Sequence, residues 1–541
     1  MGFGYAKFFA VLRLRRAEST IAAFRWKEDR DADHFETFEK VFIIHEPDQG
    51  GEAVYKWLSR SSIEEKAFIV ELGEFKDPSA LHMADPQQFE TRFNEALDNA
   101  ISFTKIEEER KAQETVAAWE KCNEIAKTPD VLGKFAETLP ACGLAGEDTT
   151  AKIVFLALVT RLLEKPVSVV VAGPSAAGKS HLVETVLKFF PDEAYHDLTA
   201  MSEKNLAYME EPLEHRFLVL YEAAGLSGDF ATYLIRSLLS EGKIKYEFVE
   251  KTSEGLRSRL IEKEGPTGLI MTTTSVWLHP ENETRLLTLT VNDTRDQTTK
   301  IFLALAEGEG GTVDFTPWRA LQIWLASTEC NVVVPFASDL ARLTKPIAVR
   351  LRRDFGAFLS LIRGHALLHK ANRLKDPKGR IVASFDDYDA VLDLVGDVIA
   401  QGVGASVPKT VKETVGVTAR IIEEEGEATV SQVAAALNLD RSAATRRIQT
   451  AVRRGFLAPV EQDKKGKGKK FVLGDPLPTE AGGIFPTRAK LEDVCTCAKS
   501  EKTPAQVKHK EYQGYRDDLC RCAGVFGGVK HTPPPGDAVI I

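Results

Sequence analysis

Short runs of apolar residues, separated by amphipathic and charged segments, divide the chain into successive units. Residues 41–44 (VFII) and 67–72 (AFIVEL) are strand-sized apolar runs, and residues 53–59 between them have helical spacing. This β-α-β pattern predicts two parallel strands joined by a right-handed crossover. Residues 87–125 are predicted to be helical and strongly charged, with a connecting helix over 100–127.

A second unit follows, in which apolar strands alternate with helices. Apolar runs predict strands at 167–172, 217–221 and 268–272, and a helix is predicted over 179–189. Strands that read as continuous apolar runs are typical of a parallel sheet that is buried on both faces. The pattern therefore predicts an α/β sheet covered by helices on both sides. Further along the chain, residues 346–400 are predicted to be mostly helical.

Beyond this region the pattern changes to three amphipathic helices and a hairpin. The helices are predicted over 411–425, 429–437 and 440–454. Thr429 and Asp440 stand at the start of the second and third helices, and both residue types are favoured N-caps. A basic Gly/Lys turn at 463–470 then separates two short apolar runs. This order of elements predicts a winged helix, a variant of the helix-turn-helix.

Composition and charge limit the class of protein. The 541 residues are 43% hydrophobic and 28% charged, which is ordinary for a soluble globular chain of about three or four domains. The net charge of −9 excludes a polycation, so contacts with nucleic acid have to come from local basic patches. The longest apolar runs are strand-sized, so no membrane span is expected. Seven sparse cysteines do not indicate a disulfide framework, and a cytoplasmic location is the default expectation.

The strongest motif has the pattern GxxxxGKS and lies between a predicted strand and a predicted helix. It consists of Gly173, Pro174, Ser175, Ala176, Ala177, Gly178, Lys179 and Ser180. In such a loop, glycines let backbone N–H groups surround the phosphates, the lysine contacts the β- and γ-phosphates, and the serine hydroxyl binds Mg²⁺. A chance match is rare, and the required strand and helix flank this one. ATP and Mg²⁺ are therefore the predicted cofactors.

Residues after the neighbouring strands supply candidate catalytic groups. Glu222 is predicted to polarise the attacking water, although Tyr221 stands where an aspartate for Mg²⁺ is usual. Thr273, the middle residue of three successive threonines, can orient the water or sense the γ-phosphate. Arg285 and Arg295 are candidates for an arginine supplied to a neighbouring subunit, with Arg285 preferred. The alternatives are a surface glutamate after a buried strand and ordinary surface salt bridges.

These motifs lie within a longer run that resembles a known family. The segments YLIRSLLSEGKIKYEFVEK, GLRSRLIEKEGPTGLIMTTT and LHPENETRLL are similar to the AAA+ helicase module of phage- and plasmid-type primase-helicases, whose layout is similar to minichromosome maintenance helicases. The resemblance covers residues 146–475 and implies a hexameric ring that acts on DNA. It also implies that a hairpin over 243–264 grips DNA in the central pore. The basic residues of this hairpin are Lys245, Lys251, Arg257 and Arg259, and the alternative is a solvated charged hairpin.

The resemblance extends to the flanking regions. Residues around Glu46 and Asp48 resemble the later half of a toprim domain, the metal-binding fold of bacterial primases. Two acidic residues one apart at a strand end suit a divalent cation. The earlier glutamate and the zinc module of that family have no counterpart, so we expect a truncated or frameshifted start and no primer synthesis by this chain alone. Downstream, the resemblance implies a helical lid whose second-sensor arginine is Arg350, Arg352 or Arg353.

The predicted winged helix carries a second group of DNA contacts. Arg446 and Arg447 lie on its third helix, which is expected to enter the major groove, and Lys465 and Lys467 lie in the wing. The alternative is a winged helix that contacts protein. In the tail, Cys495-x-Cys497 and Cys520-x-Cys522 offer four thiolates, but this spacing is a poor match to structural zinc sites.

The expected architecture is an α/β P-loop AAA+ core with a helical lid, a C-terminal winged helix and an N-terminal partial toprim-like α/β fragment. The segments are an atypical N-terminus (1–38), a partial toprim-like domain (39–100), a helical linker (101–145), the AAA+ core (146–300), the lid (301–404), the winged helix (405–478) and a largely disordered tail (479–541). The expected function is ATP-driven translocation on DNA, or its unwinding, in the replication of a mobile element. The active form is expected to be a homo-oligomer that works with other replication proteins. The alternatives are a DNA-binding AAA+ remodeller or loader without unwinding activity, and an inactive remnant, which Tyr221 would favour.

Overall fold

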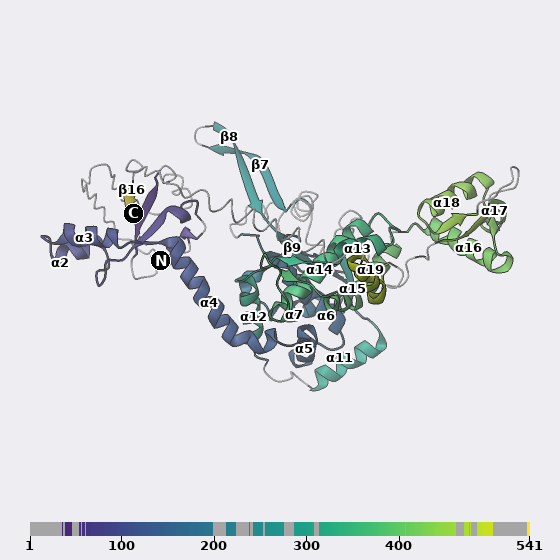
Figure 1. The fold of residues 1–541 in the computed structure, drawn as a ribbon, viewed down its shortest axis with the longest axis horizontal. Helices are drawn as coiled ribbons and strands as arrows, with labels where there is room; N and C mark the ends of the chain where they lie inside the picture. Colours follow the sequence, from purple (N-terminus) through teal and green to yellow (C-terminus); the bar gives the residue numbers. More distant parts are fainter. Residues whose placement is uncertain are drawn as a thin grey trace. The chain divides into compact units, whose positions relative to one another are not determined.

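The structure is a computed structural model and falls into two compact units, Met1–Val116 with Ala505–Ile541 and Ala117–Pro504 (Figure 1). The described residues are 35, 38–45, 54–55, 57–59, 61–198, 212–222, 237, 242–252, 255–274, 286–307, 313–405, 407–460, 470–474, 477, 484–500 and 538–540. Among them, no single helix is long and apolar enough to cross a membrane. The helices Phe385–Gly404 and Lys409–Glu425, bent by 97° relative to each other, meet that criterion only as a pair.

The first unit is built on a four-stranded sheet of order β16-β1-β2-β3. Its elements are β1 (Lys40–Ile44), η2 (Glu64–Lys66), β2 (Ala67–Val70), α2 (Pro78–Ala84), α3 (Phe89–Asp98), β3 (Ile101–Ser102), the start of α4 (Phe103–Ala126) and β16 (Ala538–Ile540). Strands β1 and β2 are parallel, with Val41 opposite Ala67, which confirms the predicted parallel pair. Because residues of a strand alternate between its faces, Val41 and Ile43 pack into one apolar cluster, and Phe42 and Ile44 into another.

The second unit contains a five-stranded, all-parallel sheet of order β10-β4-β9-β6-β5. The strands are β4 (Val169–Ala172), β5 (Tyr195–Leu198), β6 (Arg216–Leu220), β9 (Thr267–Thr273) and β10 (Leu287–Thr290); the accompanying helices are α5 (Val131–Thr138), η3 (Pro140–Cys142), α6 (Asp148–Val159), η4 (Thr160–Leu162), α7 (Lys179–Leu187) and η5 (Asp192–Ala194). Every residue of β9 is buried, as expected for a central strand with both faces covered. The ring of Phe135 lies 4.5 Å from Phe155 and 4.8 Å from Phe189, between centroids. The predicted α/β sheet is confirmed.

Further helices and a long hairpin belong to the same unit. They are β7 (Lys243–Thr252), β8 (Gly255–Glu264), α11 (Arg295–Glu307), α12 (Thr316–Ala326), β11 (Val332–Val333), α13 (Ala337–Leu343), α14 (Leu351–Leu368), η7 (Lys370–Asn372), β12 (Ile381–Val382), α15 (Phe385–Ala405) and α19 (Arg488–Ser500). Helix α19 lies inside the tail that we predicted to be largely disordered, so that prediction does not hold for residues 484–500. Phe485 stacks on Phe358 with ring centroids 4.1 Å apart, and Arg488 forms an ion pair with Asp386. These long-range contacts hold the segment, and composition alone does not reveal them.

The three predicted helices and the hairpin after them are present near the C-terminal end of this unit. They are α16 (Lys409–Glu425), β13 (Ala428–Thr429), α17 (Val430–Ala436), α18 (Arg441–Arg453), β14 (Leu457–Pro459) and β15 (Lys470–Leu473). Thr429 caps α17 in a reciprocal capping box with Gln432, and the Asp440 carboxylate accepts the first N–H groups of α18. Both predicted N-caps are therefore confirmed, and caps of this kind contribute about 1 kcal/mol each to stability.

Candidate nucleotide site

Neighbouring parallel strands of the second unit end side by side and bring the predicted phosphate-binding and catalytic residues together. Ala172, the last residue of β4, lies opposite Thr273, the last residue of β9, and β6 pairs with the other side of β9. The loop 173–180 therefore starts beside the end of β9, and Glu222 follows β6 at the same edge. Open parallel sheets bind their ligands at this carboxyl edge.

The backbone shapes the phosphate loop. Ala176 and Gly178 have φ angles of +63° and +79°, in the left-handed region that glycine adopts without steric cost. The N–H of Gly173 donates to the carbonyl of Thr273 at 3.2 Å. A Cβ on Gly173 would lie 2.3 Å from the Val291 side chain, so a larger residue would force the loop away from β10. The first helical turn of α7 directs its free N–H groups toward the loop.

The ammonium group of Lys179 is held by the loop itself. Lys179 is only 7% exposed, and its Nζ donates to the carbonyls of Gly173 at 3.0 Å and Pro174 at 2.7 Å. Charged phosphate oxygens form stronger hydrogen bonds with an ammonium than neutral carbonyls do. The arrangement therefore lets Lys179 exchange loop carbonyls for phosphate oxygens when a nucleotide binds. Ser180, the next residue, is exposed at the same helix start.

Glu222 lies in a strained position directly after β6. Its φ angle is +66°, a conformation that costs a non-glycine residue on the order of 1–3 kcal/mol. The Glu222 N–H donates to Thr272 Oγ1 at 2.8 Å, and Thr274 Oγ1 donates to Glu222 Oε1 at 3.1 Å. Two side chains at the end of β9 therefore hold the backbone and the carboxylate of this residue.

Sequence reasoning selected Thr273 from the three threonines, but its two neighbours make the contacts with Glu222. Alternation along the strand directs Thr272 and Thr274 to one face of the sheet and Thr273 to the other. Thr273 instead contributes its carbonyl to Gly173. Its catalytic role remains a prediction. To choose among the three threonines, one must know which face of β9 is directed toward Glu222 after β6. The periodicity of the sequence does not give this information.

Tyr221 changes the way in which Mg²⁺ would be held. Burial raises the pKa of this phenol, and the nearby acidic groups Glu184, Asp197 and Tyr195 raise it further. A phenol that stays protonated is a poor ligand for a hard cation. The residues present nevertheless fit Mg²⁺, which commonly takes one or two protein oxygens and completes its shell with phosphate oxygens and water. Here Ser180 would supply that oxygen, and the ion would neutralise charge on the β- and γ-phosphates.

A cavity of about 720 Å³ adjoins the phosphate loop. Its lining combines the loop, the segment before α6, and α11: Ala141, Cys142, Gly143, Leu144, Ala145, Glu147, Ala176, Ala177, Gly178, His181, Lys188, Gln297, Ile301, Ala304, Leu305, Val313 and Phe315. The amide of Gln297 donates to the carbonyl of Ala145 at 2.5 Å, and the Glu147 carboxylate accepts the Asn292 N–H at 2.8 Å. Cavities of this size and largely apolar lining are typical of small-molecule sites, so the space fits a nucleoside beside its phosphates.

Comparison with known proteins agrees with this geometry. Residues 115–313 match a family described as the MTBMA_p00010 P-loop domain. This part of the chain is a P-loop domain. The family match and the all-parallel sheet together support a P-loop nucleotide-binding core, and its assignment to the AAA+ type remains a prediction. The primase-helicase and mobile-element assignments are finer than this and remain predictions.

The other comparisons add little to the P-loop assignment. No curated protein matches the chain. Among solved structures, the chain is similar to the Orc1 protein of Aeropyrum pernix in complex with DNA, at 14% identity over 70% of this chain and 95% of that chain. The TM-score is 0.22, so this likeness carries no weight for fold or function.

The candidate arginines are only partly placed around the P-loop domain. Arg295 is the exposed first residue of α11, and Arg285 lies outside the described residues. Arg350 is buried, forms an ion pair with Asp354 at 3.1 Å, and donates to the carbonyl of Leu286 at 3.4 Å. Leu286 leads into β10 at the edge where the parallel strands begin. Arg350 therefore lies at the edge opposite the phosphate loop.

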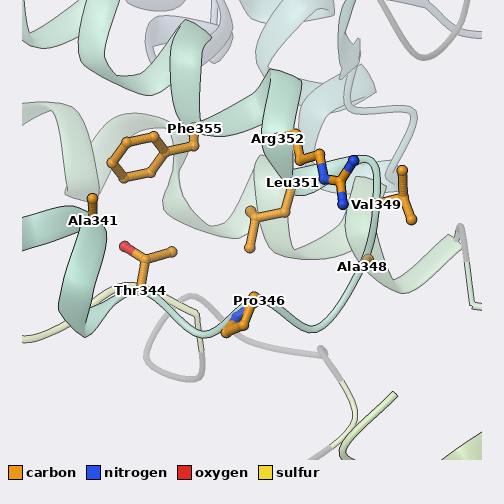
Figure 2. Close-up of a pocket in the computed structure, with 8 residues that line it drawn as sticks. All are labelled: Ala341, Thr344, Pro346, Ala348, Val349, Leu351, Arg352 and Phe355. Atoms are coloured by element: carbon orange, nitrogen blue, oxygen red, sulfur yellow. The ribbon is translucent and has the colours of Figure 1, made fainter. Parts of the chain in front are cut away.

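A smaller cavity of about 260 Å³ lies where α13 leads into α14 (Figure 2). It is lined by Ala341, Thr344, Pro346, Ala348, Val349, Leu351, Arg352 and Phe355. Arg352, another second-sensor candidate, supplies the one charged group among these eight residues. The lining offers no metal ligand and no acidic partner, so the cavity does not suggest a catalytic site.

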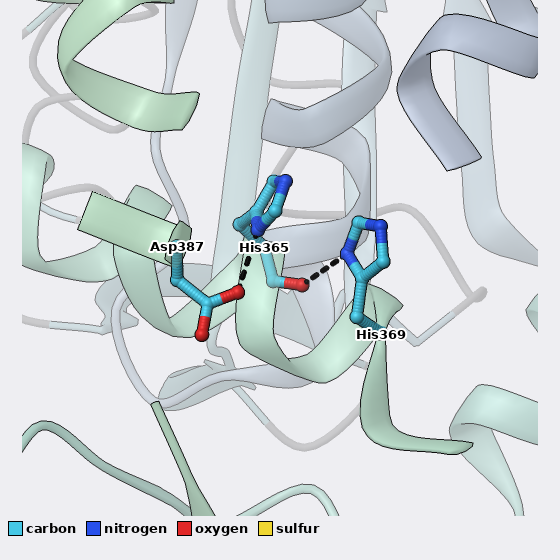
Figure 3. A group of neighbouring side chains, drawn as sticks. All are labelled: His365, His369 and Asp387. Atoms are coloured by element: carbon cyan, nitrogen blue, oxygen red, sulfur yellow. Dashed lines mark hydrogen bonds and ion pairs between the residues drawn. The ribbon is translucent and has the colours of Figure 1, made fainter. Parts of the chain in front are cut away.

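Two histidines and an aspartate form a buried polar cluster that sequence reasoning missed (Figure 3). His365 lies on the last turn of α14, and His369, four residues later, is the C-cap of that helix. His365 Nδ1 lies 2.7 Å from Asp387 Oδ1, and Arg373 donates to the same carboxylate at 2.6 and 3.0 Å. Burial opposes ionisation of Asp387, but these hydrogen bonds prevail and hold its pKa well below the usual range. His369 Nδ1 contacts the His365 carbonyl at 3.0 Å, and its Nε2 accepts the Val131 N–H at 3.3 Å.

The hairpin formed by β7 and β8 has two different faces. It is antiparallel over its full length and extends from the body of the unit (Figure 1). On one face, Tyr246 stacks on Phe248 with ring centroids 5.7 Å apart. On the other, Lys245 Nζ lies 2.6 Å from Glu262 Oε1, and this hydrogen bond raises the pKa of Lys245. The carboxylate of Glu262 therefore compensates part of the positive charge that Lys245 would offer to a DNA phosphate. The backbones of Lys251, Arg257 and Arg259 lie in these strands, but their side chains are outside the described set.

The remaining predicted contacts are divided between exposed, paired and undescribed residues. Arg446 is exposed on α18. Arg447 lies 3.5 Å from Glu413 of α16, so part of its charge is already compensated. Glu46, Asp48, Lys465 and Lys467 lie outside the described residues.

Proposed function

We propose that the protein is an oligomeric ATPase that translocates on DNA, or unwinds it, during replication of a mobile element. The observation that carries the proposal is the connection between the nucleotide site and the β7–β8 hairpin. Along the chain the hairpin lies between β6, which leads to Glu222, and β9, which ends at Thr273. The base of the hairpin lies at the start of β9, where the Gly265 N–H donates to the Gly242 carbonyl at 2.7 Å, so β9 itself would connect the hairpin with the nucleotide edge at Thr273. A hexameric ring is the assembly proposed by analogy.

The face of the hairpin that carries Tyr246 and Phe248 supports contact with single-stranded DNA. Stacked aromatic rings bind bases with little sequence preference, and each stacked base contributes about 1–3 kcal/mol. We include Lys251, Arg257 and Arg259 as candidate phosphate contacts. In this proposal α16–α18 with their hairpin act as a winged helix, in which Arg446 and Arg447 contact duplex DNA and Lys465 and Lys467 form the wing. A metal role for Glu46 and Asp48 in a partial toprim fold stays part of the proposal, and primer synthesis does not.

ATP hydrolysis by the full chain, with and without single-stranded DNA, tests the proposal. We expect DNA to stimulate hydrolysis several-fold and the Tyr246→Ala/Phe248→Ala variant to lose that stimulation while keeping its basal rate. Val249→Ala is the matched control, because Val249 is exposed on the opposite face of the same strand. Hydrolysis that depends on Lys179 but ignores DNA would count against the motor and favour an ATP-dependent remodeller or loader. A chain without any hydrolysis would favour the inactive remnant.

A further inference from the structure

Glu222 needs outside support to keep its position. Strand β6 ends at Leu220, two residues earlier, so the Glu222 N–H has left the β-ladder. The left-handed backbone at this residue is intrinsically unfavourable. A strained conformation persists only where the surrounding structure over-determines it, and such sites cluster where function requires them.

Thr272 supplies this support from the neighbouring strand. Its side chain is 1% exposed, and its Oγ1 accepts the Glu222 N–H at 2.8 Å. The hydroxyl therefore takes the place of the backbone carbonyl that an uninterrupted strand would offer. A valine at this position would have the same shape but no acceptor, which would leave the amide of Glu222 without this partner.

Thr274 acts on the carboxylate of the same glutamate. It lies two residues after Thr272, so both side chains are on the same face of the chain. Its hydroxyl donates to Glu222 Oε1 at 3.1 Å, which fixes the rotation of the carboxylate. Oε2 then remains as the oxygen that can accept a hydrogen bond from water.

We propose that Thr272 and Thr274 are a pair of positioning residues that hold Glu222 for ATP hydrolysis; the inference rests on the proposed ATPase function. A water held at Oε2 forms the new oxygen–phosphorus bond to the γ-phosphate, and the bond to the bridging oxygen breaks, leaving its electron pair on ADP. The proton of the water passes to Glu222 and then to solvent. Both threonines contact Glu222, and in this proposal they act through it.

Steady-state hydrolysis by the full chain tests the pair. Thr272→Val should lower kcat about 10–100-fold, because a small displacement of a catalytic group has effects of this size. KM and the affinity for a fluorescent ATP analogue should change little. Thr272→Ser, which keeps the hydroxyl, should recover most of the rate. Thr274→Val, at an exposed position that does not threaten folding, should lower kcat about 10-fold.

Thr267→Val is the matched control. Thr267 is a buried threonine of the same strand, 4% exposed, whose hydroxyl donates to the Leu213 carbonyl at the opposite edge of the sheet. It should lower the melting temperature as much as Thr272→Val does and leave kcat unchanged. A general loss of stability would lower the rate of both variants alike, and that outcome would overturn the proposal.

A double-mutant cycle separates this inference from the proposed function. In a Glu222→Gln background, Thr272→Val should have almost no further effect, since residues that act as a unit are non-additive. An equal loss in both backgrounds would show that Thr272 does not act through Glu222. If Glu222→Gln lowers hydrolysis but neither threonine variant does, only the positioning role is wrong. If the wild type does not exceed Lys179→Ala, the ATPase proposal fails, and the positioning role with it.

Discussion

The carboxyl edge of the P-loop sheet and the buried cluster on α14 and α15 both gather charged side chains, but they differ in how those side chains are satisfied. At the sheet edge, Lys179 rests on two neutral carbonyls beside a cavity, and Glu222 is exposed. In the cluster, His365, His369 and Asp387 are buried and each has hydrogen-bond partners within the chain. In a ligand site, charged side chains have weak partners that a ligand can replace. In a structural cluster, the charged side chains already form strong hydrogen bonds within the chain.

Backbone strain separates the two regions in the same way. Ala176 and Glu222 have positive φ angles without being glycine, and both lie at the sheet edge. In the cluster, His365 lies on the last turn of α14, His369 is the C-cap of that helix with a φ angle of −98°, and Asp387 lies at the start of α15. His215 and Asn438 also have positive φ angles and lie outside both regions, so strain alone does not mark the active site. Of the two regions compared, the sheet edge is the one that contains such residues, as expected where function requires a particular geometry.

The largest effect is expected at the sheet edge. Lys179→Ala should lower ATP hydrolysis by at least about 100-fold, because it removes a fixed charge from the site where the phosphates gain negative charge. The melting temperature without nucleotide should change little, since among the described residues the ammonium donates to two neutral loop carbonyls and forms no ion pair. Hydrolysis assays and thermal melts on the same preparation measure both quantities. A large fall in melting temperature without nucleotide would show that Lys179 stabilises the fold, as the buried cluster does, and is not kept free for a ligand.

Removing a charge from the cluster should lower stability and leave ATP hydrolysis unchanged, which is the opposite of the result expected for Lys179→Ala. Asp387→Asn leaves the partly buried guanidinium of Arg373 without its fully buried carboxylate partner, which should lower the free energy of unfolding by about 3 kcal/mol. Hydrolysis per folded molecule should be retained. Glu114→Gln removes the exposed pair with Arg110 and should cost less than about 1 kcal/mol. Urea unfolding of both variants measures the difference, and equal effects would contradict the contrast between buried and exposed pairs.

The cluster should also make stability depend on pH. Burial first, and then the charge of His365, lowers the pKa of His369 to about 4, from an ordinary value of 6.5. Between these values the unfolded chain binds a proton that the folded chain does not, so stability is complete above pH 6.5 and falls toward pH 4, by roughly 3 kcal/mol. His369→Gln should flatten this slope.

The exposed residue His82 provides the control for this titration. His82→Gln should leave the dependence on pH as it is in the wild type. Unfolding by urea at several pH values between 4 and 8 measures both variants. A slope that survives in His369→Gln would assign the titration to another group.

The sequence predicted those parts of the molecule that depend on local pattern. The phosphate loop, the parallel strands and the caps Thr429 and Asp440 follow from residue type and spacing, and the structure contains them. The histidine cluster depends on Asp387 from a different helix, and the pairing of Lys245 with Glu262 depends on hairpin register. The fold of residues 484–500 depends on packing against distant helices. Contacts between remote segments are set by tertiary structure, which periodicity does not encode.

The smallest effect on stability is expected from added zinc, although His365, His369 and Asp387 lie close enough together to form a metal site. Binding would need a lone pair from His369, but its Nδ1 contacts the His365 carbonyl and its Nε2 accepts the Val131 N–H. It would also have to compete with the Arg373 guanidinium for Asp387. We therefore expect zinc to leave the melting temperature unchanged, whereas a ligand at 100 times its Kd stabilises by about 2.7 kcal/mol. ATP with Mg²⁺ serves as the positive control and should stabilise the wild type but not Lys179→Ala. Stabilisation by zinc that disappears in His369→Gln would make the cluster a metal site and remove the distinction between the two regions.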